Sequence, residues 1–455
     1  MISFLPLGGA NEIGASCFYL NIEGSGIILD CGTHPQKNGI ESLPHFDLLS
    51  SLPVDVSLIS HAHQDHIDAL PFLIQKHPYA KIYTTPQTRG IAELTLHNAV
   101  GIMQEQLKEQ NIFHPYTHEE IDLLIQSIQW KTYQERFLIN GYRHGSAESI
   151  HASFHDAGHI LGSAGIFIEH DNRTIFYTGD ISLDAQFVLP GANIPKSNIE
   201  TLIIECTHGA TEDVLLPDRN EEKIRFASRA NQILEKGGSI LIPVFALGKM
   251  QEMLAMIGRL MHKGTLAAVD VYTGGLGKKL THIYDKNRYA VPFNNPDEIL
   301  EEYQHRDLYK TEQLMDVMRT PSIILASSGM VVEGTASFKL AQLWMQHKKN
   351  AVFLVGYMDS STPGYRLQES NSGDTIQLTD TTEPQTIRCS IDRFRFSAHS
   401  SRERLMEAIQ QIAPKNIILV HGEPESIDWM GNEILSILPK TKVHAAELGK
   451  QIFIK

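Results

Sequence analysis

The sequence predicts an α/β protein in which one domain is inserted into another. Short strand-like apolar runs mark the first two hundred residues or so, and a polar residue soon follows each of several runs. From about residue 220 the pattern becomes an alternation of strands and helices, which is typical of a doubly wound sheet. About the last sixty residues return to the first pattern. We therefore expect the two ends of the chain to form one domain and the middle to form another.

The composition is that of a globular protein, with 455 residues, 42% hydrophobic and 20% charged. This length allows two or three domains. The longest apolar runs fall short of the roughly 20 residues that a membrane span needs. The N-terminal sequence MISFLPLGGANEIG has no basic segment ahead of an apolar core, so we expect no secretory signal. Four cysteines without a CxxC pair indicate no disulfide framework. These features predict a soluble, reduced, cytoplasmic protein.

The first region contains four short β-rich runs that we expect to be strands: 26–29, 56–59, 174–177 and 201–204. Within three residues, they lead respectively to Asp30, His61, Asp180 and Glu205. Helices are expected at 69–76 and 87–108. Because chemistry in α/β proteins often lies at strand ends, these four polar residues are candidates for a site.

The middle region is expected to alternate helices at 221–236, 249–262 and 337–346 with strands at 239–243, 267–272, 322–326 and 351–355. The final region is expected to contain a helix at 401–411 and a strand at 416–420, which His421 follows directly.

The strongest motif is HAHQDH at residues 61–66, which places four ligand-type side chains within six residues. Alternate residues of an extended segment point the same way, so His61 and His63 can share one metal ion. Asp65 and His66 enter the next helix and can turn toward a second ion. The HxHxDH pattern therefore predicts a metal site.

Four further candidates each follow a strand or a glycine turn: His159, Asp180, His399 and His421. Taken singly, each is explained by structure at least as well as by function. His155 is a rival to His159, and the Gly-Asp pair at Asp180 is ordinary turn chemistry. Together with HxHxDH, they supply enough ligands for two four- or five-coordinate ions with a bridging carboxylate.

The order HxHxDH, GH, GD resembles the metallo-β-lactamase fold. The elements IIECTHG, FSAHSS and ILVHGE resemble motifs A, B and C of its β-CASP branch of nucleic-acid-processing nucleases. ILDCGTHPQKNGIESLPHFDLL and IPVFALGKMQE are especially similar to the mRNA 3′-end-processing endonucleases. The length, with no appended tail or KH domain, resembles the stand-alone bacterial and archaeal members. The resemblance implies an αββα sandwich formed by residues 1–208 and 392–455, with a doubly wound β-CASP domain at 209–391 inserted into it.

The resemblance also implies a centre with two zinc ions, although manganese or iron would suit the same ligands. The implied ligands of one ion are His61, His63, His159 and Asp180. The implied ligands of the other are Asp65, His66, His421 and the bridging Asp180. His399 would donate a proton beside the scissile phosphate, and Glu205 would orient it. Asp30 would support the metal loop, with simple turn formation as the alternative role.

The implied activity is that of a zinc-dependent endoribonuclease. A hydroxide activated by two ions would attack phosphorus and leave 5′-phosphate and 3′-hydroxyl ends. A histidine in motif C, here His421, accompanies the RNA-processing members. Three alternatives stay open: a 5′→3′ exoribonuclease, a hydrolase of a small ester, thioester or lactone, and a non-catalytic RNA-binding scaffold. The middle domain and His399 argue against a small substrate, and the retention of all seven metal ligands argues against a scaffold.

The net charge of −14 opposes binding of a polyanion, so RNA would need a local basic surface or bound cations. Residues 386–404 carry five arginines against two acids, and we hypothesise that this segment, with Arg395, lines the substrate cleft between the domains. Lys249 stands where relatives often have arginine. The turn Ser327-Ser328-Gly329 resembles a phosphate-proximal loop of the family.

Two departures from the family motifs concern substrate preference and the tuning of His399. His208 replaces the tyrosine of motif A, and Ser401 replaces an acidic residue after the motif-B histidine. Neither removes a metal ligand. Homodimers are common in the family, so the resemblance also implies a homodimer.

Overall fold

The computed structural model describes residues 2–109, 116–141, 149–212, 218–304, 306–310, 317 and 319–454. It divides into two compact units, each of which is described here by itself. Unit 1 comprises Met1–Ala185, Gly191–Leu215 and His399–Lys455, and unit 2 comprises Gln186–Pro190 and Leu216–Ala398. Both units combine strands and helices, so the predicted α/β class is confirmed.

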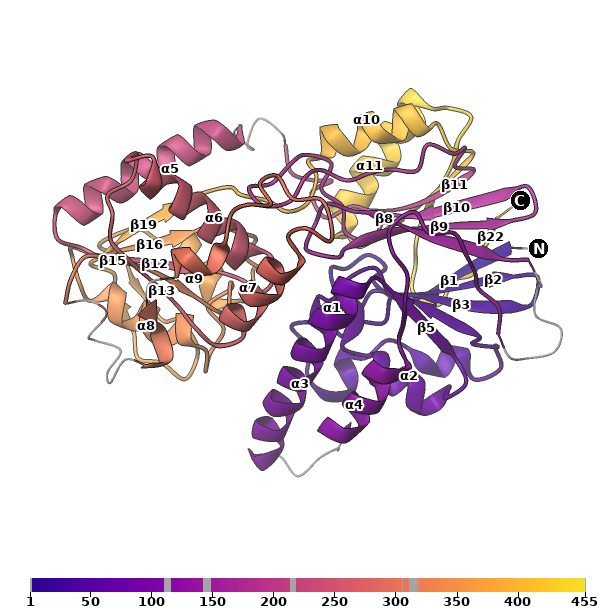
Figure 1. Cartoon of the computed structure of the whole chain (residues 1–455), viewed down its shortest axis with the longest axis horizontal. Coiled ribbons are helices and arrows are strands. Elements are labelled where there is room, and N and C mark those ends of the chain that lie inside the picture. Colours follow the sequence, from indigo (N-terminus) through magenta and orange to yellow (C-terminus); the bar gives the residue numbers. More distant parts are fainter. Residues whose placement is uncertain are drawn as a thin grey trace. The chain divides into compact units, whose positions relative to one another are not determined.

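The described part of unit 1 forms two seven-stranded sheets (Figure 1). The first has the order β22(Ile452–Ile454), β1(Ile2–Gly8), β2(Cys17–Ile22), β3(Ser25–Leu29), β4(Val56–Leu58), β5(Lys81–Thr84), β6(Gln129–Trp130). The second has the order β21(Lys442–Ala445), β20(Asn416–Val420), β11(Thr201–Glu205), β10(Arg173–Tyr177), β9(Ala164–His170), β8(His151–Asp156), β7(Phe137–Leu138). In both sheets, a strand that ends at or before residue 205 therefore pairs with a strand from the last forty residues of the chain.

The two sheets pack through one apolar core. Phe4 and Phe18 of the first sheet stack at 5.5 Å, and Phe18 meets Tyr177 of the second sheet edge-on at 5.8 Å. Ile166 and Ile418 belong to the same cluster and are fully buried. Burying both inner faces is what holds the layers together, because each apolar side chain removed from water contributes roughly 1.5–3 kcal/mol.

Helices accompany both sheets of unit 1: α1(Gln64–Ile67), α2(Leu70–Lys76), α3(Pro86–Glu109), α4(His118–Ser127), α10(Arg402–Ile412), α11(Pro424–Ile437). Short 3₁₀ turns lie at Gly39–Ser42 and Phe46–Leu49. The helices α10 and α11, in yellow in Figure 1, bury Leu405 and Ile427 against Leu202 and Leu419 on the outer face of the second sheet. Helix α4 starts at a capping box formed by Thr117 and Glu120.

Unit 2 is built around a parallel sheet with the order β14(Arg306–Asp307), β13(Asp270–Thr273), β15(Ser322–Ala326), β12(Ile240–Pro243), β16(Ala351–Leu354), β19(Ser390–Arg393). Its helices are α5(Arg219–Glu235), α6(Lys249–His262), α7(Gly275–Asn287), α8(Ala336–Met345) and α9(Pro363–Gln368). It also has 3₁₀ turns at Leu300–Tyr303 and Leu308–Lys310 and a hairpin of β17(Thr375–Ile376) and β18(Gln385–Thr386). Near-continuous apolar strands are expected where helices cover both faces of a sheet.

Several expected elements coincide with observed ones. The predicted helix 249–262 is α6, and the predicted strands 322–326 and 416–420 are β15 and β20. The expected strand 267–272 is shifted, since β13 spans Asp270–Thr273. None of the helices in the described part of the chain combines the length and the apolar character needed to cross a bilayer.

Candidate metal centre

The centre is built on the loop between β4 and α1. His61 and His63 precede α1, and Asp65 and His66 lie within it. Backbone hydrogen bonds from Ser16 N to Asp65 O and from Cys31 N to His66 O, both 2.8 Å, hold this segment in place. Gly32 permits that approach, because a Cβ atom there would lie 1.8 Å from the carbonyl carbon of Asp65.

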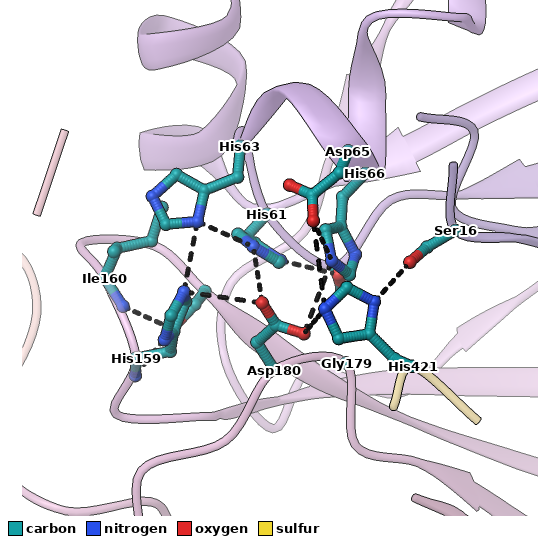
Figure 2. Close-up of polar contacts among 12 residues, drawn as sticks. Ser16, His61, His63, Asp65, His66, His159, Ile160, Gly179, Asp180 and His421 are labelled. Carbon is teal, nitrogen blue, oxygen red and sulfur yellow. Dashed lines mark hydrogen bonds and ion pairs between the residues drawn. The ribbon is translucent and has the colours of Figure 1, made fainter. Parts of the chain in front are cut away.

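One group of four side chains matches the ligands predicted for the first ion (Figure 2). His63 Nδ1 lies 3.2 Å from His61 Nε2 and 3.1 Å from His159 Nε2. Asp180 Oδ2 lies 3.6 Å from the Nε2 atoms of both His61 and His159. The strand β8 and a glycine turn deliver His159, and the turn after β10 delivers Asp180.

A second group lies on the other side of Asp180 (Figure 2). Asp65 Oδ2 is 3.7 Å from His66 Nε2 and 3.8 Å from His421 Nε2. The other oxygen of Asp180, Oδ1, is 3.3 Å from His66 Nε2 and 3.6 Å from His421 Nε2. The two oxygens of Asp180 therefore face different groups, which is the arrangement of a bridging carboxylate.

Two observations indicate that these residues fit a metal centre. Metal–ligand bonds of about 2.0–2.2 Å in a tetrahedral site put neighbouring ligand atoms about 3.3–3.6 Å apart, close to the spacings in both groups. In addition, the buried atoms His66 Nε2 and Asp180 Oδ1 make no hydrogen bond. Buried polar atoms without hydrogen bonds are costly unless another partner, such as a cation, satisfies them.

Residues behind the ligands fix their orientation. Asp30 is fully buried, and its Oδ2 atom accepts hydrogen bonds from His66 Nδ1 at 2.8 Å, Tyr177 OH at 2.6 Å and Ser60 Oγ at 2.7 Å. Because His66 donates through Nδ1, Nε2 is the ring nitrogen that is directed into the centre. The supporting role of Asp30 stays a prediction.

The sequence analysis did not identify three hydroxyl groups that contact the predicted ligands or Asp30. Ser16 Oγ lies 2.8 Å from His421 Nδ1, and Ser60 Oγ lies 2.9 Å from His61 Nδ1. The Tyr177 hydroxyl is the third. Ser60 directly precedes His61, and Tyr177 lies three residues before Asp180. Their closeness to predicted ligands could have identified them as supporting residues. Ser16 follows a glycine-rich turn that carries no ligand pattern of its own.

Burial and neighbouring charges shift the pKa values of residues in the centre. Burial and then the charge of His66 lower the pKa of His61 well below its usual range, which favours the neutral imidazole that a metal requires. Burial alone would raise the pKa of Asp180, but His66 and His421 outweigh it and hold that pKa well below the usual range. Asp180 is therefore an ionised carboxylate in its buried position.

Two of the predicted residues have an unusual backbone conformation. Asp30 and His421 have φ values of 58° and 48°, in the left-handed region that residues other than glycine rarely occupy. Each directly follows a strand, β3 or β20. Such conformations are commonly found at functional sites, where the surrounding structure holds them.

His399 and Glu205 form a pair beside the first group. His399 Nδ1 lies 3.0 Å from Glu205 Oε1, and the His399 ring centroid is 4.6 Å from that of His159. Glu205 is 1% exposed, and Ile181 N donates to the same oxygen at 2.8 Å. His208, at the motif-A departure, packs edge-on against His399 at 6.0 Å.

Other predicted residues lie elsewhere. His155, the rival of His159, packs against Phe167 and Phe176 and belongs to neither group. Ser401 caps α10 through a hydrogen bond from Arg404 N.

The predicted substrate-binding residues Lys249, Ser327, Ser328, Gly329 and Arg395 belong to unit 2. Lys249 donates to the carbonyl of Phe396, and Ser328 O accepts from Ser337 Oγ at 2.7 Å. Their substrate role stays a prediction.

Three family models match the chain. A metallo-beta-lactamase superfamily domain matches residues 19–206, and a Beta-Casp domain matches residues 250–367. A Zn-dependent metallo-hydrolase RNA specificity domain matches residues 384–453.

Curated relatives match along nearly all of the chain. The cleavage and polyadenylation specificity factor subunit 3 of Dictyostelium discoideum is 30% identical over 96% of this chain and 55% of its own length. Endoribonuclease YSH1 of Candida glabrata is 30% identical over 95% of this chain and 56% of its own. The cleavage and polyadenylation specificity factor 73 of Drosophila melanogaster is 30% identical over 93% and 60%. The chain spans little more than half the length of these relatives.

A crystal structure of an Enterococcus faecalis protein of unknown function matches with a TM-score of 0.58 at 13% identity, over 100% of both chains. That likeness concerns the fold alone.

Proposed function

This chain belongs to the β-CASP branch of the metallo-β-lactamase family, and from that premise we propose that it is a zinc-dependent endoribonuclease. The proposed reaction is hydrolysis of RNA phosphodiester bonds to 5′-phosphate and 3′-hydroxyl ends. The names of relatives such as Endoribonuclease YSH1 support an RNA substrate.

The observation that carries the proposal is the gathering of six His and Asp side chains around Asp180, with its two oxygens facing different groups. Both groups, His61–His63–His159–Asp180 and Asp65–His66–His421, come from strand ends and loops far apart in sequence. We assign one zinc ion to each group, with Asp180 shared between them. When bound, two such ions supply an activated water and neutralise charge on the phosphate.

His399 is the proposed proton donor to the departing sugar oxygen. Its Nδ1 atom faces Glu205, so Nε2 is the nitrogen left to act on a substrate. Burial opposes the protonated form of His399, but Glu205 outweighs it and raises the pKa of His399 to about 9. A protonated imidazole at neutral pH can donate a proton, and such a donor contributes about 10²–10⁴-fold.

Glu205 is the proposed positioning residue for His399. It accepts hydrogen bonds from His399 and from Ile181 N, and the latter fixes the carboxylate to the turn that follows Asp180. A carboxylate held in this way keeps the imidazole in one tautomer and one orientation. The same arrangement of carboxylate and histidine serves many hydrolases.

We also propose the domain boundaries 1–208, 209–391 and 392–455 for the two parts of the metallo-β-lactamase domain and the inserted β-CASP domain. The division into units that change near residues 215 and 398 supports this assignment.

The decisive experiment is cleavage of a 5′-labelled single-stranded RNA beside DNA of the same sequence. We expect internal RNA fragments from the wild-type chain and none from a folded Asp65→Ala variant. Release of mononucleotides would instead indicate a 5′→3′ exonuclease. If a zinc-loaded chain cleaves neither nucleic acid, the endoribonuclease proposal for this chain alone is refuted.

Two assays separate the remaining alternatives in that case. RNA binding without cleavage would identify a scaffold, and turnover of a small ester, thioester or lactone would identify a small-substrate hydrolase. Metal analysis of the purified chain accompanies both assays, because an absence of bound zinc would be a separate reason to favour the scaffold.

A further inference from the structure

A second His–carboxylate cluster lies in unit 1, away from the candidate centre. It comprises Glu23, His170 and Asp171. Glu23 occupies the tight turn between β2 and β3, whereas His170 ends β9 and Asp171 lies in the turn before β10. The cluster therefore joins a hairpin of the first sheet to a hairpin of the second.

The spacing within this cluster is that of ligands around an ion. His170 Nε2 lies 3.3 Å from Glu23 Oε2 and 3.7 Å from Asp171 Oδ2. Tetrahedral zinc ligands lie about 3.3–3.6 Å apart, as in the candidate centre. One ligand atom from each residue lies within 4.8 Å of the other two.

Burial of His170 gives an independent reason to expect a ligand. The residue is 6% exposed, and neither of its ring nitrogens makes a hydrogen bond. A buried imidazole without a hydrogen bond is destabilising unless a cation or proton satisfies it. The side chains of Glu23 and Asp171 are 53% and 70% exposed, so water can complete a coordination shell.

We infer that Glu23, His170 and Asp171 form a third cation site, which takes a divalent ion such as zinc and fastens the two sheets together. One imidazole and two carboxylates are the donor set that zinc accepts, and the two negative charges balance a divalent ion.

The site is structural rather than catalytic because of its place on the strands. The strand β3 begins two residues after Glu23 and ends just before Asp30, and β10 begins two residues after Asp171 and ends three residues before Asp180. Each strand has five residues, about 17 Å at roughly 3.3 Å per residue. The cation would therefore secure the far ends of two strands whose near ends form the candidate centre.

This site should bind more weakly than the candidate centre. The ligands His61, His66 and His421 are each backed by a serine or aspartate, whereas Nδ1 of His170 has no hydrogen-bond partner. Loss of such support typically weakens metal binding by about 10–100-fold.

Calorimetric titration of the metal-free full chain with Zn²⁺ tests the inference. We expect a weaker step of one zinc per chain after the tight sites fill. Glu23→Gln should weaken that step at least about tenfold, because an anionic ligand is lost. Since Glu23 is exposed, this variant avoids the folding risk of substituting buried His170.

The matched control is His282→Gln, since His282 is exposed, lies 3.1 Å from Glu301 and belongs to no ligand group among the described residues. It should leave the weak step unchanged. Zinc-edge anomalous density at His170 Nε2 in wild-type crystals would support the same conclusion. The inference is overturned if wild type lacks the weak step or if Glu23→Gln leaves it unaltered.

Discussion

His399 Nδ1 lies 3.0 Å from the Oε1 atom of Glu205, a carboxylate that is 1% exposed and fixed by the Ile181 amide. The contact joins the loop after the inserted unit to the end of β11. Because Glu205 outweighs the effect of burial on His399, its charge controls whether the proposed proton donor is protonated.

Glu205→Gln should shift the alkaline limb of the pH–rate profile. The proposed donor acts when protonated, so activity falls as pH rises through the pKa of His399, which Glu205 raises to about 9. Removing the charge lowers that pKa, so the limb should move to lower pH by roughly 1–3 pH units. The measurement is kcat for RNA cleavage between pH 5 and 10. An unmoved limb would mean that Glu205 does not tune His399.

His399→Ala should keep zinc and lose about 10²–10⁴-fold in kcat, the usual contribution of a general acid. Zinc content by elemental analysis separates this role from ligation. Loss of a zinc ion in this variant would make His399 a ligand and would contradict its proposed role.

Asp65→Ala should abolish cleavage while the chain stays folded. Asp65 is partly exposed, and its carboxylate faces His66 and His421 in the second group. Circular dichroism and chelator-competition assays should show a folded chain with reduced zinc affinity. Normal turnover by a metal-replete sample would exclude the two-ion mechanism.

Asp30→Asn should weaken zinc binding by about 10–100-fold, because a neutral amide holds His66 less firmly than a carboxylate does. Ser60 N and Oγ and the Tyr177 hydroxyl also donate to Asp30, so the amide nitrogen would meet donors. Competition with a chromophoric chelator measures the change. Equal affinity in the two proteins would show that Asp30 only shapes the turn.

Lys249→Met should flatten the pH dependence of stability. Burial, reinforced by the charge of Arg219, lowers the pKa of Lys249 to about 7. From about pH 7 to 10.5 the unfolded chain holds a proton that the folded chain has lost, so the Lys249 contribution to the free energy of unfolding increases with pH.

The slope that disappears in Lys249→Met is at most about 1.4 kcal/mol per pH unit. Urea unfolding at several pH values measures it. Parallel curves for the two proteins would rule out a lowered pKa.

The sequence predicted the candidate site best where several ligand-type residues lie close together along the chain. HAHQDH at 61–66 and the polar residues after β10 and β20 predicted groupings that lie together in the structure. The period and turn signals also located β15, β20 and α6. Local patterns work at these positions because several ligand-type residues occur together, whereas each of them alone would also fit a structural role.

Contacts between distant segments could not be predicted in the same way. Glu23 and His170 meet only because two hairpins of different sheets end side by side, and neither turn carries a metal pattern. Ser16 is equally uninformative as a single residue. The internal partner of Lys249 depends on packing between α6 and the chain near Phe396, which sequence spacing does not encode.

The hydrogen bond between Ser16 and His421 spans 405 residues of chain, and it has a consequence for biosynthesis. At about 5–20 residues per second, a ribosome makes these two residues roughly 20–80 s apart. Throughout that interval the emerging polypeptide carries HAHQDH but lacks His399 and His421. The candidate centre therefore cannot be complete until the last segment of the chain has left the ribosome.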